Sequence, residues 1–355
     1  MVQHFLFKIL LAPFSLLYGA GVGLRNQFYR WEFLKSVSFD LPVISVGNLS
    51  VGGAGKTPHI EYLIRLLNTY LEVATLSRGY KRKTKGYLVV QPNMNAEQVG
   101  DEPLQFKRKY RDVTVTVSES RVFGIPSIVA DYPATQVVLL DDAFQHRAVQ
   151  PGMNIMLTEH DHPFYKDYLL PSGRLREWRS AYQRADVVIV SKCPREEEAV
   201  DREALLKGIE PLPAQKVFFS YYDYGTPYFF LDSRYRAELK PDLDVILICA
   251  IARTEYLTSY LDAKVRSVSV MEFEDHHFFT KYDIAQLKEN YERLESKQKL
   301  ILTTEKDAMR LELHQAYIRE NQMPIFSIPV AVKFHFEEGE HFNDHVKQYL
   351  LDFKV

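Results

Sequence analysis

The chain has 355 residues and a formal net charge of −2, with 46% hydrophobic and 25% charged residues. These proportions are those of a globular protein, so they exclude a disordered chain and a multi-span membrane protein. At roughly 100–200 residues per domain, the length predicts two domains. The near-neutral charge gives no basic field for nucleic acid, so no nucleic-acid partner is expected. Two isolated cysteines, Cys193 and Cys249, favour a reducing compartment.

The first 24 residues are mostly apolar, but Lys8, Pro13 and three glycines interrupt the run. A spanning helix needs about 20 apolar residues without such breaks, and a signal peptide needs its charge before the apolar run. Basic and aromatic residues follow, among them Arg25 and Trp31. We therefore expect residues 1–24 to form a helix that lies in the membrane interface, with a buried core helix and a true span as the alternatives.

From residue 41 onward, short apolar runs alternate with helical stretches, which predicts an α/β fold with mostly parallel sheets. Strands are expected at 43–46, 73–76, 113–117, 137–140, 154–157, 187–190, 245–249, 265–270, 300–302 and 325–330. The aromatic, turn-bearing segment at 220–232 predicts a two-stranded linker. The expected parts are thus an N-terminal helix (1–24), a nucleotide-binding domain (25–219), the linker (220–232) and a smaller C-terminal α/β domain (233–355).

The clearest motif runs from Ser50 to Thr57 and ends in Gly-Lys-Thr. It follows an expected strand and opens an amphipathic helix, which is the context of a phosphate-binding loop. Backbone N–H groups of such a loop surround phosphate oxygens, while its lysine reaches the β- and γ-phosphates and its hydroxyl residue holds Mg²⁺. The residues expected to bind nucleotide are Gly52, Gly53, Ala54, Gly55, Lys56 and Thr57. Ser50 stands where the general pattern begins with glycine.

Two carboxylates, Asp141 and Asp142, end the apolar run at 137–140. A phosphate loop needs an acidic partner on a neighbouring strand to fix its metal, so these residues predict a site for Mg-nucleotide. The motif alone leaves three classes open: a kinase, a GTPase-type switch, and an ATPase regulator or motor. The segment 280–283 (TKYD) has the letters of a guanine-reading motif, but Thr280 and Asp283 fit better as the capping signal of the following helix.

A kinase also needs a group that accepts or orients the acceptor's hydroxyl proton. Two clusters offer one: the acidic turn GDEP at 100–103 and the run EDHH at 274–277. The residues leave open which of His276 and His277 would face the site.

Seven blocks in this order and spacing closely resemble the tetraacyldisaccharide 4′-kinase family, the lipid A 4′-kinases of Gram-negative bacteria. They are SVGNLSVGGAGKTP (45–58), LSRGYKR (76–82), GDEP (100–103), LLDDAFQHR (139–147), LLPSGRLRE (169–177), DH (275–276) and TTEKDA (303–308). The resemblance spans nearly the whole chain and is far more specific than the phosphate loop alone. Ala143 and Ser172 depart from the commoner family residues, and Ala250-Ile251-Ala252 replaces a more usual glycine-containing turn.

The resemblance implies transfer of the ATP γ-phosphate to the 4′-hydroxyl of a tetraacylated glucosamine disaccharide 1-phosphate, giving lipid IVA. It implies two α/β/α domains, an N-terminal core like that of phosphate-loop NTPases and a two-stranded linker. It further implies a peripheral enzyme held by its N-terminal helix at the cytoplasmic face of the inner membrane. ATP and Mg²⁺ are the implied cofactors, and the lipid substrate and the membrane surface are the implied partners.

Carried onto this chain, the resemblance assigns roles to single residues. Asp101 matches the catalytic base and His276 its paired histidine. Thr57, Asp141 and Asp142 are expected to hold Mg²⁺, with assistance from Glu102. Arg78, Arg121 and Arg176 are candidates for contacts to the substrate's phosphate or sugar.

Asp101 and His276 fall in different expected halves of the chain, which predicts a pair assembled by domain closure. The rival hypothesis is a nucleotide-dependent regulatory module that hydrolyses ATP without an acceptor.

Overall fold

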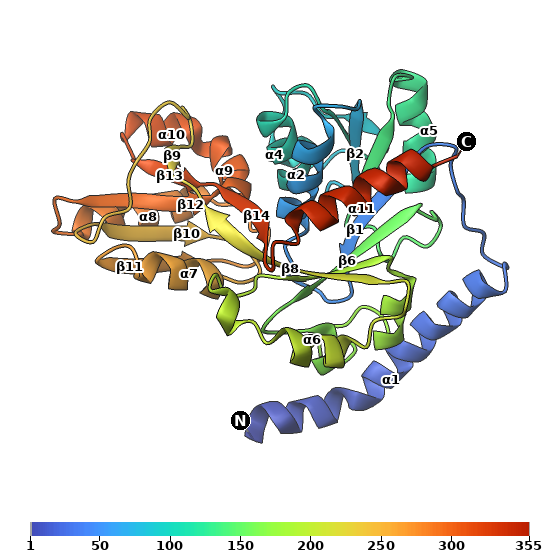
Figure 1. Cartoon of the computed structure of the whole chain (residues 1–355). Helices are drawn as coiled ribbons and strands as arrows, with labels where there is room; N and C mark the ends of the chain where they lie inside the picture. The colour runs from blue at the N-terminus through green and yellow to red at the C-terminus, as the bar shows by residue number, and fades with distance from the viewer. Residues whose placement is uncertain (1, 355) are drawn as a thin grey trace. The chain divides into compact units, whose positions relative to one another are not determined.

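The computed structural model describes residues 2–354 of the backbone and the side chains of residues 10–354 (Figure 1). It divides into two compact units. Unit 1 contains residues 1–78, 118–222 and 332–355, and unit 2 contains residues 79–117 and 223–331. The chain therefore passes between the units four times, and each unit is built from separated stretches of sequence.

Helix α1 (Val2–Arg30) begins unit 1 and lies against the loop at 167–178. Ser15 Oγ donates to the carbonyl of Leu169 over 3.1 Å, and Trp178 Nε1 donates to the carbonyl of Gly19 over 2.8 Å. These contacts use one side of the helix and leave apolar side chains such as Phe14 and Leu17 exposed. Among the described residues, no helix combines the length and the apolar character needed to cross a membrane.

A mostly parallel sheet forms the centre of unit 1, in the order β14-β8-β7-β6-β1-β5-β2. Its strands are β1 (Val43–Asn48), β2 (Val73–Ser77), β5 (Val137–Asp141), β6 (Met153–Glu159), β7 (Val187–Ser191), β8 (Lys216–Tyr224) and β14 (Val330–Phe334). Besides α1, the helices of this unit are α2 (Lys56–Leu67), α5 (Arg121–Asp131), α6 (Arg202–Ile209) and α11 (Gly339–Asp352), with short 3₁₀ turns at 164–166, 179–184 and 197–199. Strand β1 lies between β5 and β6, so the loop that follows β1 starts at the middle of the sheet.

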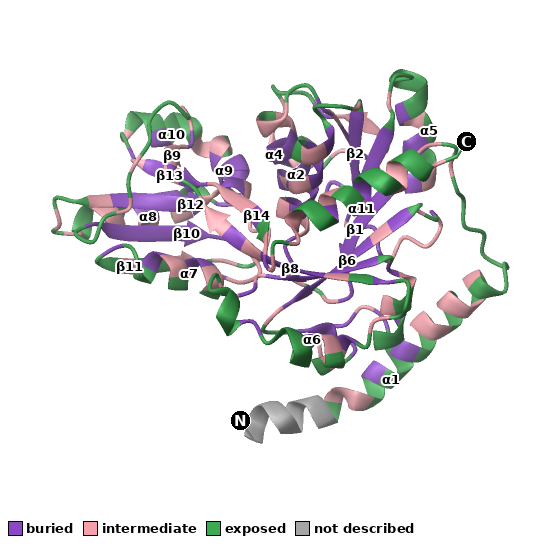
Figure 2. Ribbon diagram, viewed as in Figure 1, coloured by how far each residue is buried: buried purple, intermediate pink, exposed green. Residues whose placement is uncertain are grey.

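Unit 2 has a second sheet in the order β11-β10-β12-β13-β9. Its strands are β9 (Tyr228–Phe229), β10 (Asp244–Cys249), β11 (Ser267–Glu272), β12 (Lys299–Thr304) and β13 (Ile325–Ile328), and β3 (Leu88–Val89) with β4 (Thr114–Val117) forms an antiparallel pair. Its helices are α3 (Ala96–Val99), α4 (Asp101–Lys109), α7 (Glu255–Asp262), α8 (Lys281–Arg293), α9 (Glu305–Leu311) and α10 (Gln315–Glu320), with a 3₁₀ turn at 312–314. Strands β10 and β12 are almost wholly buried (Figure 2).

The α/β class and the mostly parallel sheets predicted from the sequence are confirmed, and every expected strand is present. The strand at 113–117, β4, also pairs antiparallel with β3, a short strand at 88–89 that the sequence did not predict. The capping role of Thr280 and Asp283 is confirmed, since the two residues form a reciprocal capping box at the start of α8. The segment at 220–232 contains parts of two strands, β8 and β9, and each joins a different sheet.

The division into units differs from the expected domains in two places. Residues 79–117 belong to unit 2 because α4 packs on α9, where Lys109 pairs with Glu305 over 2.6 Å. Residues 332–355 return to unit 1, where Phe342 of α11 packs against Phe218 and Tyr62. Neither stretch carries a compositional signal that would reveal this rearrangement.

Candidate active site

The loop between β1 and α2 places Lys56 at the first position of α2. Gly55, the residue before the helix, has φ 88°, a left-handed conformation that favours glycine. A Cβ at Gly55 would lie 2.2 Å from the hydroxyl oxygen of Tyr222. The loop therefore reaches the helix N-terminus in a conformation that presents backbone N–H groups and the helix's positive end.

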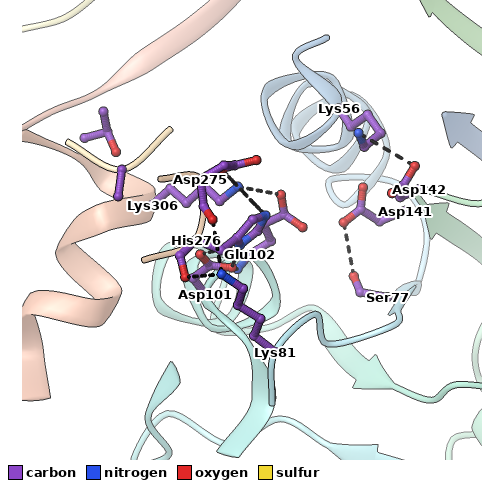
Figure 3. A network of polar contacts seen from close by, with 12 residues as sticks. Lys56, Ser77, Lys81, Asp101, Glu102, Asp141, Asp142, Asp275, His276 and Lys306 are labelled. Carbon is purple, nitrogen blue, oxygen red and sulfur yellow. Dashed lines mark hydrogen bonds and ion pairs between the residues drawn. The ribbon is translucent and has the colours of Figure 1, made fainter. Parts of the chain in front are cut away.

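The two expected metal carboxylates lie at the end of β5, the strand beside β1: Asp141 is its last residue and Asp142 follows it (Figure 3). Val46 pairs with Asp141 in the strand register, which brings the end of β5 next to the start of the loop. Ser77 Oγ donates to Asp141 Oδ2 over 3.4 Å. Asp142 Oδ1 lies 3.7 Å from the Lys56 ammonium nitrogen, so the glycine-containing loop and the strand-end acids form one site inside unit 1.

Arg176 is the second positively charged residue beside Asp142, in addition to Lys56. Its guanidinium donates to Asp142 Oδ1 over 3.1 Å and to Gln145 Oε1 over 3.2 Å. Burial alone would raise the pKa of Asp142, but the positive charges of Lys56 and Arg176 outweigh it and lower the pKa to about 2. Asp142 is therefore ionised at neutral pH.

Asn48 and Gln145 tie the elements of this site together. Lys56 Nζ donates to Asn48 Oδ1 over 3.2 Å, and Gln145 Nε2 donates to the Asn48 carbonyl over 2.8 Å. Neither residue had a role in the sequence analysis. Both stand in blocks that carry the family resemblance, and that was the only signal that could have found them.

The three arginines expected at the substrate lie in different surroundings within unit 1. Arg121 is 2% exposed and donates to the carbonyls of Ser118 and Asp141, over 3.1 and 3.0 Å. It thus braces the end of β5 from inside the protein, and its contact with substrate stays a prediction. Arg176 binds Asp142, as described above, and Arg78 is exposed.

Unit 2 contains a second polar cluster, centred on Asp101 at the first position of α4 (Figure 3). Asp101 is 3% exposed, and its Oδ2 atom lies 2.9 Å from His276 Nδ1. A Cβ at Gly100 would lie 3.1 Å from the Cα of Gly79, and Gly100 has φ 91°. Two glycine turns therefore approach closely behind Asp101 and bring the segment at 79–82 beside it.

Asp101 also pairs with Arg310 of α9, whose NH1 nitrogen lies 2.9 Å from Asp101 Oδ2. Arg310 is fully buried and also donates to the carbonyl of Ala250 over 3.0 Å and to the carboxylate of Asp307. Burial would raise the pKa of Asp101, but the positive charges of Lys306 and Arg310 and the hydrogen bond from His276 hold it well below its usual range. The carboxylate is therefore kept ionised.

The structure distinguishes the two neighbouring histidines. His277 Nε2 lies 2.9 Å from Asp283 Oδ2, and its ring stacks on Phe273 at 4.8 Å, so His277 belongs to the capping region of α8. His276 alone of the two contacts Asp101. Glu102 Oε1 lies 3.2 Å from the ammonium of Lys306, and its expected assistance to the metal stays a prediction.

Both members of the Asp101–His276 pair lie in unit 2, so the expectation that they fall in different halves is wrong. The expectation assumed one boundary in the chain, whereas α4 packs with the elements that follow the boundary. Sequence reasoning also missed Lys306, which stands in the family block TTEKDA (303–308), and Arg310, which lies just after it.

Similarity to known proteins identifies the family of this chain. The family model described as Tetraacyldisaccharide-1-P 4′-kinase matches residues 7–350. The chain belongs to this family. The predicted family and the enzyme class, a kinase, are therefore confirmed.

Individual relatives match over almost their whole length. A protein named tetraacyldisaccharide 4′-kinase from Bacteroides fragilis is 41% identical over 349 residues, covering 96% of this chain and 93% of the relative. One of the same name from Porphyromonas gingivalis is 42% identical over 341 residues, covering 94% of this chain and 95% of the relative. The solved structure of LpxK from Aquifex aeolicus in complex with ATP is similar with a TM-score of 0.73 and 29% identity, covering 97% of this chain and 99% of that one.

Proposed function

We propose that this chain transfers the γ-phosphate of ATP to the 4′-hydroxyl of tetraacyldisaccharide 1-phosphate, giving lipid IVA in lipid A biosynthesis. The observation that carries the proposal is the Lys56–Asp142 site in a chain of this family, with Asp142 Oδ1 3.7 Å from Lys56 Nζ. The ATP complex of the Aquifex aeolicus LpxK supports ATP as the donor.

The loop at 52–57 is the proposed site for the nucleotide's phosphates. Backbone N–H groups at the start of α2 would bind the phosphate oxygens, and Lys56 would lie against the β- and γ-phosphates. Lys56 reaches Asn48 and Asp142, so its ammonium group is already held at the loop. This arrangement supplies positive charge where the transferring group gains negative charge.

Thr57, Asp141 and Asp142 are the proposed ligands of Mg²⁺. Their donor atoms are hydroxyl and carboxylate oxygens, which is the ligand type that Mg²⁺ prefers. Among the residues that the structure describes, no group of three or more His, Cys, Asp or Glu side chains could hold a metal ion. This fits Mg²⁺, which protein carboxylates commonly bind together with substrate phosphates rather than in an all-protein cage. Bound there, the ion would neutralise charge on the phosphates.

Asp101 is the proposed acceptor of the 4′-hydroxyl proton. Its carboxylate is ionised and oriented by His276 and Arg310, so it can accept a proton. The strong ion pairs also make it a weak base on its own, and we therefore expect proton transfer to occur late, as the sugar oxygen gains its bond to phosphorus. Arg78, Arg121 and Arg176 are the proposed contacts to the substrate's phosphate or sugar.

Helix α1 is the proposed membrane contact, at the cytoplasmic face of the inner membrane. Four acyl chains hold the substrate in the bilayer, because each buried CH₂ contributes about 0.8 kcal/mol. The exposed apolar side chains of α1 and of the segment after it would enter the interface; among them are Leu10, Phe14, Leu16, Leu17, Leu24, Trp31 and Phe33. The protein would thus meet its substrate without extracting it.

The deciding experiment incubates the full chain with Mg²⁺ and γ-labelled ATP, with and without the disaccharide lipid. The proposal expects label in the lipid, at the 4′ position. The rival hypothesis, a regulatory module that only hydrolyses ATP, expects label in inorganic phosphate whether or not lipid is present. That second result would refute the proposed function.

A further inference from the structure

The side chain of Lys306, at the second position of α9, lies against the ring of His276. Lys306 Nζ is 3.0 Å from His276 Nε2. An ammonium group has hydrogen atoms to donate and no lone pair with which to accept. The Nε2 atom of His276 must therefore be the nitrogen that accepts, and it carries no proton in this arrangement.

The other ring nitrogen, Nδ1, faces the Asp101 carboxylate, at 2.9 Å from Oδ2 and 3.2 Å from Oδ1. An ionised carboxylate only accepts hydrogen bonds, so Nδ1 must carry the proton. The contacts on both sides of the ring therefore require the same neutral tautomer, with the proton on Nδ1.

We propose that Lys306 is a positioning residue that fixes His276 in the Nδ1–H tautomer and so holds Asp101 in the orientation needed to receive the acceptor's proton. This inference rests on the proposed function, because it assigns Lys306 a part in that reaction. It concerns atoms of unit 2 alone.

Two acidic side chains hold Lys306 in place. Its Nζ lies 3.2 Å from Glu102 Oε1 and 3.6 Å from Asp275 Oδ1. Asp275 Oδ1 is also 3.8 Å from His276 Nε2, so by itself this carboxylate would favour a proton on Nε2. The ammonium group of Lys306 lies nearer to Nε2 and opposes that preference. Removing the ammonium group should therefore allow Nε2 to carry a proton.

The backbone of His276 is fixed independently of Lys306. Its φ is 58°, in the left-handed region, and its N–H donates to the carbonyl of Ala250 over 3.1 Å. Lys81 Nζ donates to the carbonyl of His276 over 3.1 Å, and the ring of Tyr80 packs edge-on against the imidazole at 4.7 Å. These contacts place the ring but do not distinguish its nitrogens, so the choice of tautomer depends on its polar partners.

The first test observes the tautomer directly in the full chain labelled with ¹⁵N-histidine. Long-range proton–nitrogen spectra report which ring nitrogen carries the proton, and the His276→Gln variant identifies the signals of His276. In the wild type we expect a protonated Nδ1 and an unprotonated Nε2. In Lys306→Met we expect a mixture of tautomers or protonation of both nitrogens. A protonated Nε2 in the wild type, or an unchanged spectrum in Lys306→Met, would overturn the proposal.

The second test measures kinase turnover with the disaccharide lipid. Loss of an outer-shell partner of a metal-bound histidine typically costs about 10- to 100-fold, and we expect a loss on the same scale for this orienting partner. We expect Lys306→Met to lower kcat by about that factor while KM for ATP stays within about 2-fold. Lys306→Gln can still donate an N–H to Nε2 and should recover part of the loss. The matched control is Lys297→Met, which changes an exposed lysine of the same unit.

The outcomes separate this proposal from the proposed function. If the wild type transfers no phosphate to the lipid, the proposed function fails, while the spectra still decide the tautomer. If the wild type is active and Lys306→Met keeps full kcat, the positioning role fails alone. If Lys306→Met does not fold, the spectrum and kcat of Lys306→Gln decide instead. A mixture of tautomers in Lys306→Gln together with full kcat would contradict the positioning role, because turnover would then not depend on the tautomer.

Discussion

His276 Nδ1 lies 2.9 Å from Asp101 Oδ2, although 175 positions separate the two residues in the chain. Both belong to unit 2, in which α4 and α9 pack together and carry Asp101 and Arg310. The proposed base is thus already oriented by its partners within one compact unit. Closure of one unit on the other is not needed to form the pair itself.

Replacing Asp101 tests the proposed base most directly. Asp101→Asn preserves the shape of the side chain but removes its negative charge and its capacity to accept the acceptor's proton. Loss of a general base typically costs about 10²–10⁴ in rate, so we expect kcat to fall by that factor. ATP affinity, measured by calorimetry, should change little because the proposed nucleotide site, the loop at 52–57, lies in unit 1.

The control for this variant is Asp112→Asn, which neutralises an exposed carboxylate of the same unit. It should retain wild-type kcat. Equal turnover in Asp101→Asn and Asp112→Asn would remove Asp101 from the mechanism.

Lys56→Met tests the proposed phosphate contact. The substitution keeps a long side chain but removes the ammonium group beside Asp142 and Asn48. We expect weaker binding of ATP, by about 10-fold or more, and a fall in kcat, since the charge on the transferring phosphate is no longer neutralised. Lys85→Met, at an exposed lysine of unit 2, is the control. Undiminished ATP affinity in Lys56→Met would argue against the site.

Local signals in the sequence predicted the strands and the position of the glycine-containing loop. The loop lies between β1 and α2, and buried apolar runs gave β5 and its terminal Asp141. What failed was the assignment of residues 79–117, because packing of α4 on α9 joins stretches that are far apart in the chain. Lys306 and Arg310 were missed for the same reason, since a charged residue on a short helix shows no partner until the fold supplies one.

A buried histidine of α2, His59, should make stability depend on pH. His59 is 3% exposed, and its Nδ1 lies 2.7 Å from the carbonyl of Gly55, which can only accept, so Nδ1 carries the proton. Its Nε2 lies 3.1 Å from Ser220 Oγ and accepts from that hydroxyl. Burial lowers the pKa of His59 to about 4, so the ring is neutral in the folded protein at neutral pH.

The unfolded chain should have a histidine pKa of about 6.5. Between that value and about 4 the unfolded state takes up a proton that folded His59 does not, so the free energy of unfolding falls as the pH is lowered. From pH 7 to pH 5 the contribution of this one residue is about 2 kcal/mol. Chemical denaturation at pH 7 and at pH 5 gives the free energy of unfolding at each pH. Between the two pH values His59→Asn should lose less of this free energy than the wild type does, by that amount. The control His341→Asn, at an exposed position, should follow the wild type. Parallel curves for all three proteins would contradict the explanation.

The exposed side of α1 should mediate binding to lipid. Leu17→Glu introduces a charge at a position that is 72% exposed, so the fold should tolerate it. Placing a carboxylate in the membrane interface opposes insertion, and we expect less protein to sediment with anionic vesicles. Leu351→Glu, at an 80% exposed leucine of α11, is the matched control and should bind vesicles as the wild type does. Equal sedimentation of both variants would place the membrane contact elsewhere.

Gly55 combines two structural demands that can be separated by experiment. Its φ of 88° strains any residue with a Cβ, at a cost of about 1–2 kcal/mol, and its Cβ would also meet the hydroxyl oxygen of Tyr222 at 2.2 Å. Gly86 has a similar φ of 78°, but nothing lies within 4 Å of its Cβ position, so Gly86→Ala measures the backbone strain alone. We expect Gly55→Ala to lower the free energy of unfolding by more than Gly86→Ala does. Adding Tyr222→Phe, which removes the hydroxyl, should recover part of that difference but not the strain.

Because the loop carries the proposed phosphate contacts, Gly55→Ala should also weaken ATP binding, whereas Gly86→Ala should not. A Gly55→Ala protein with wild-type stability and ATP affinity would show that the loop does not need this conformation.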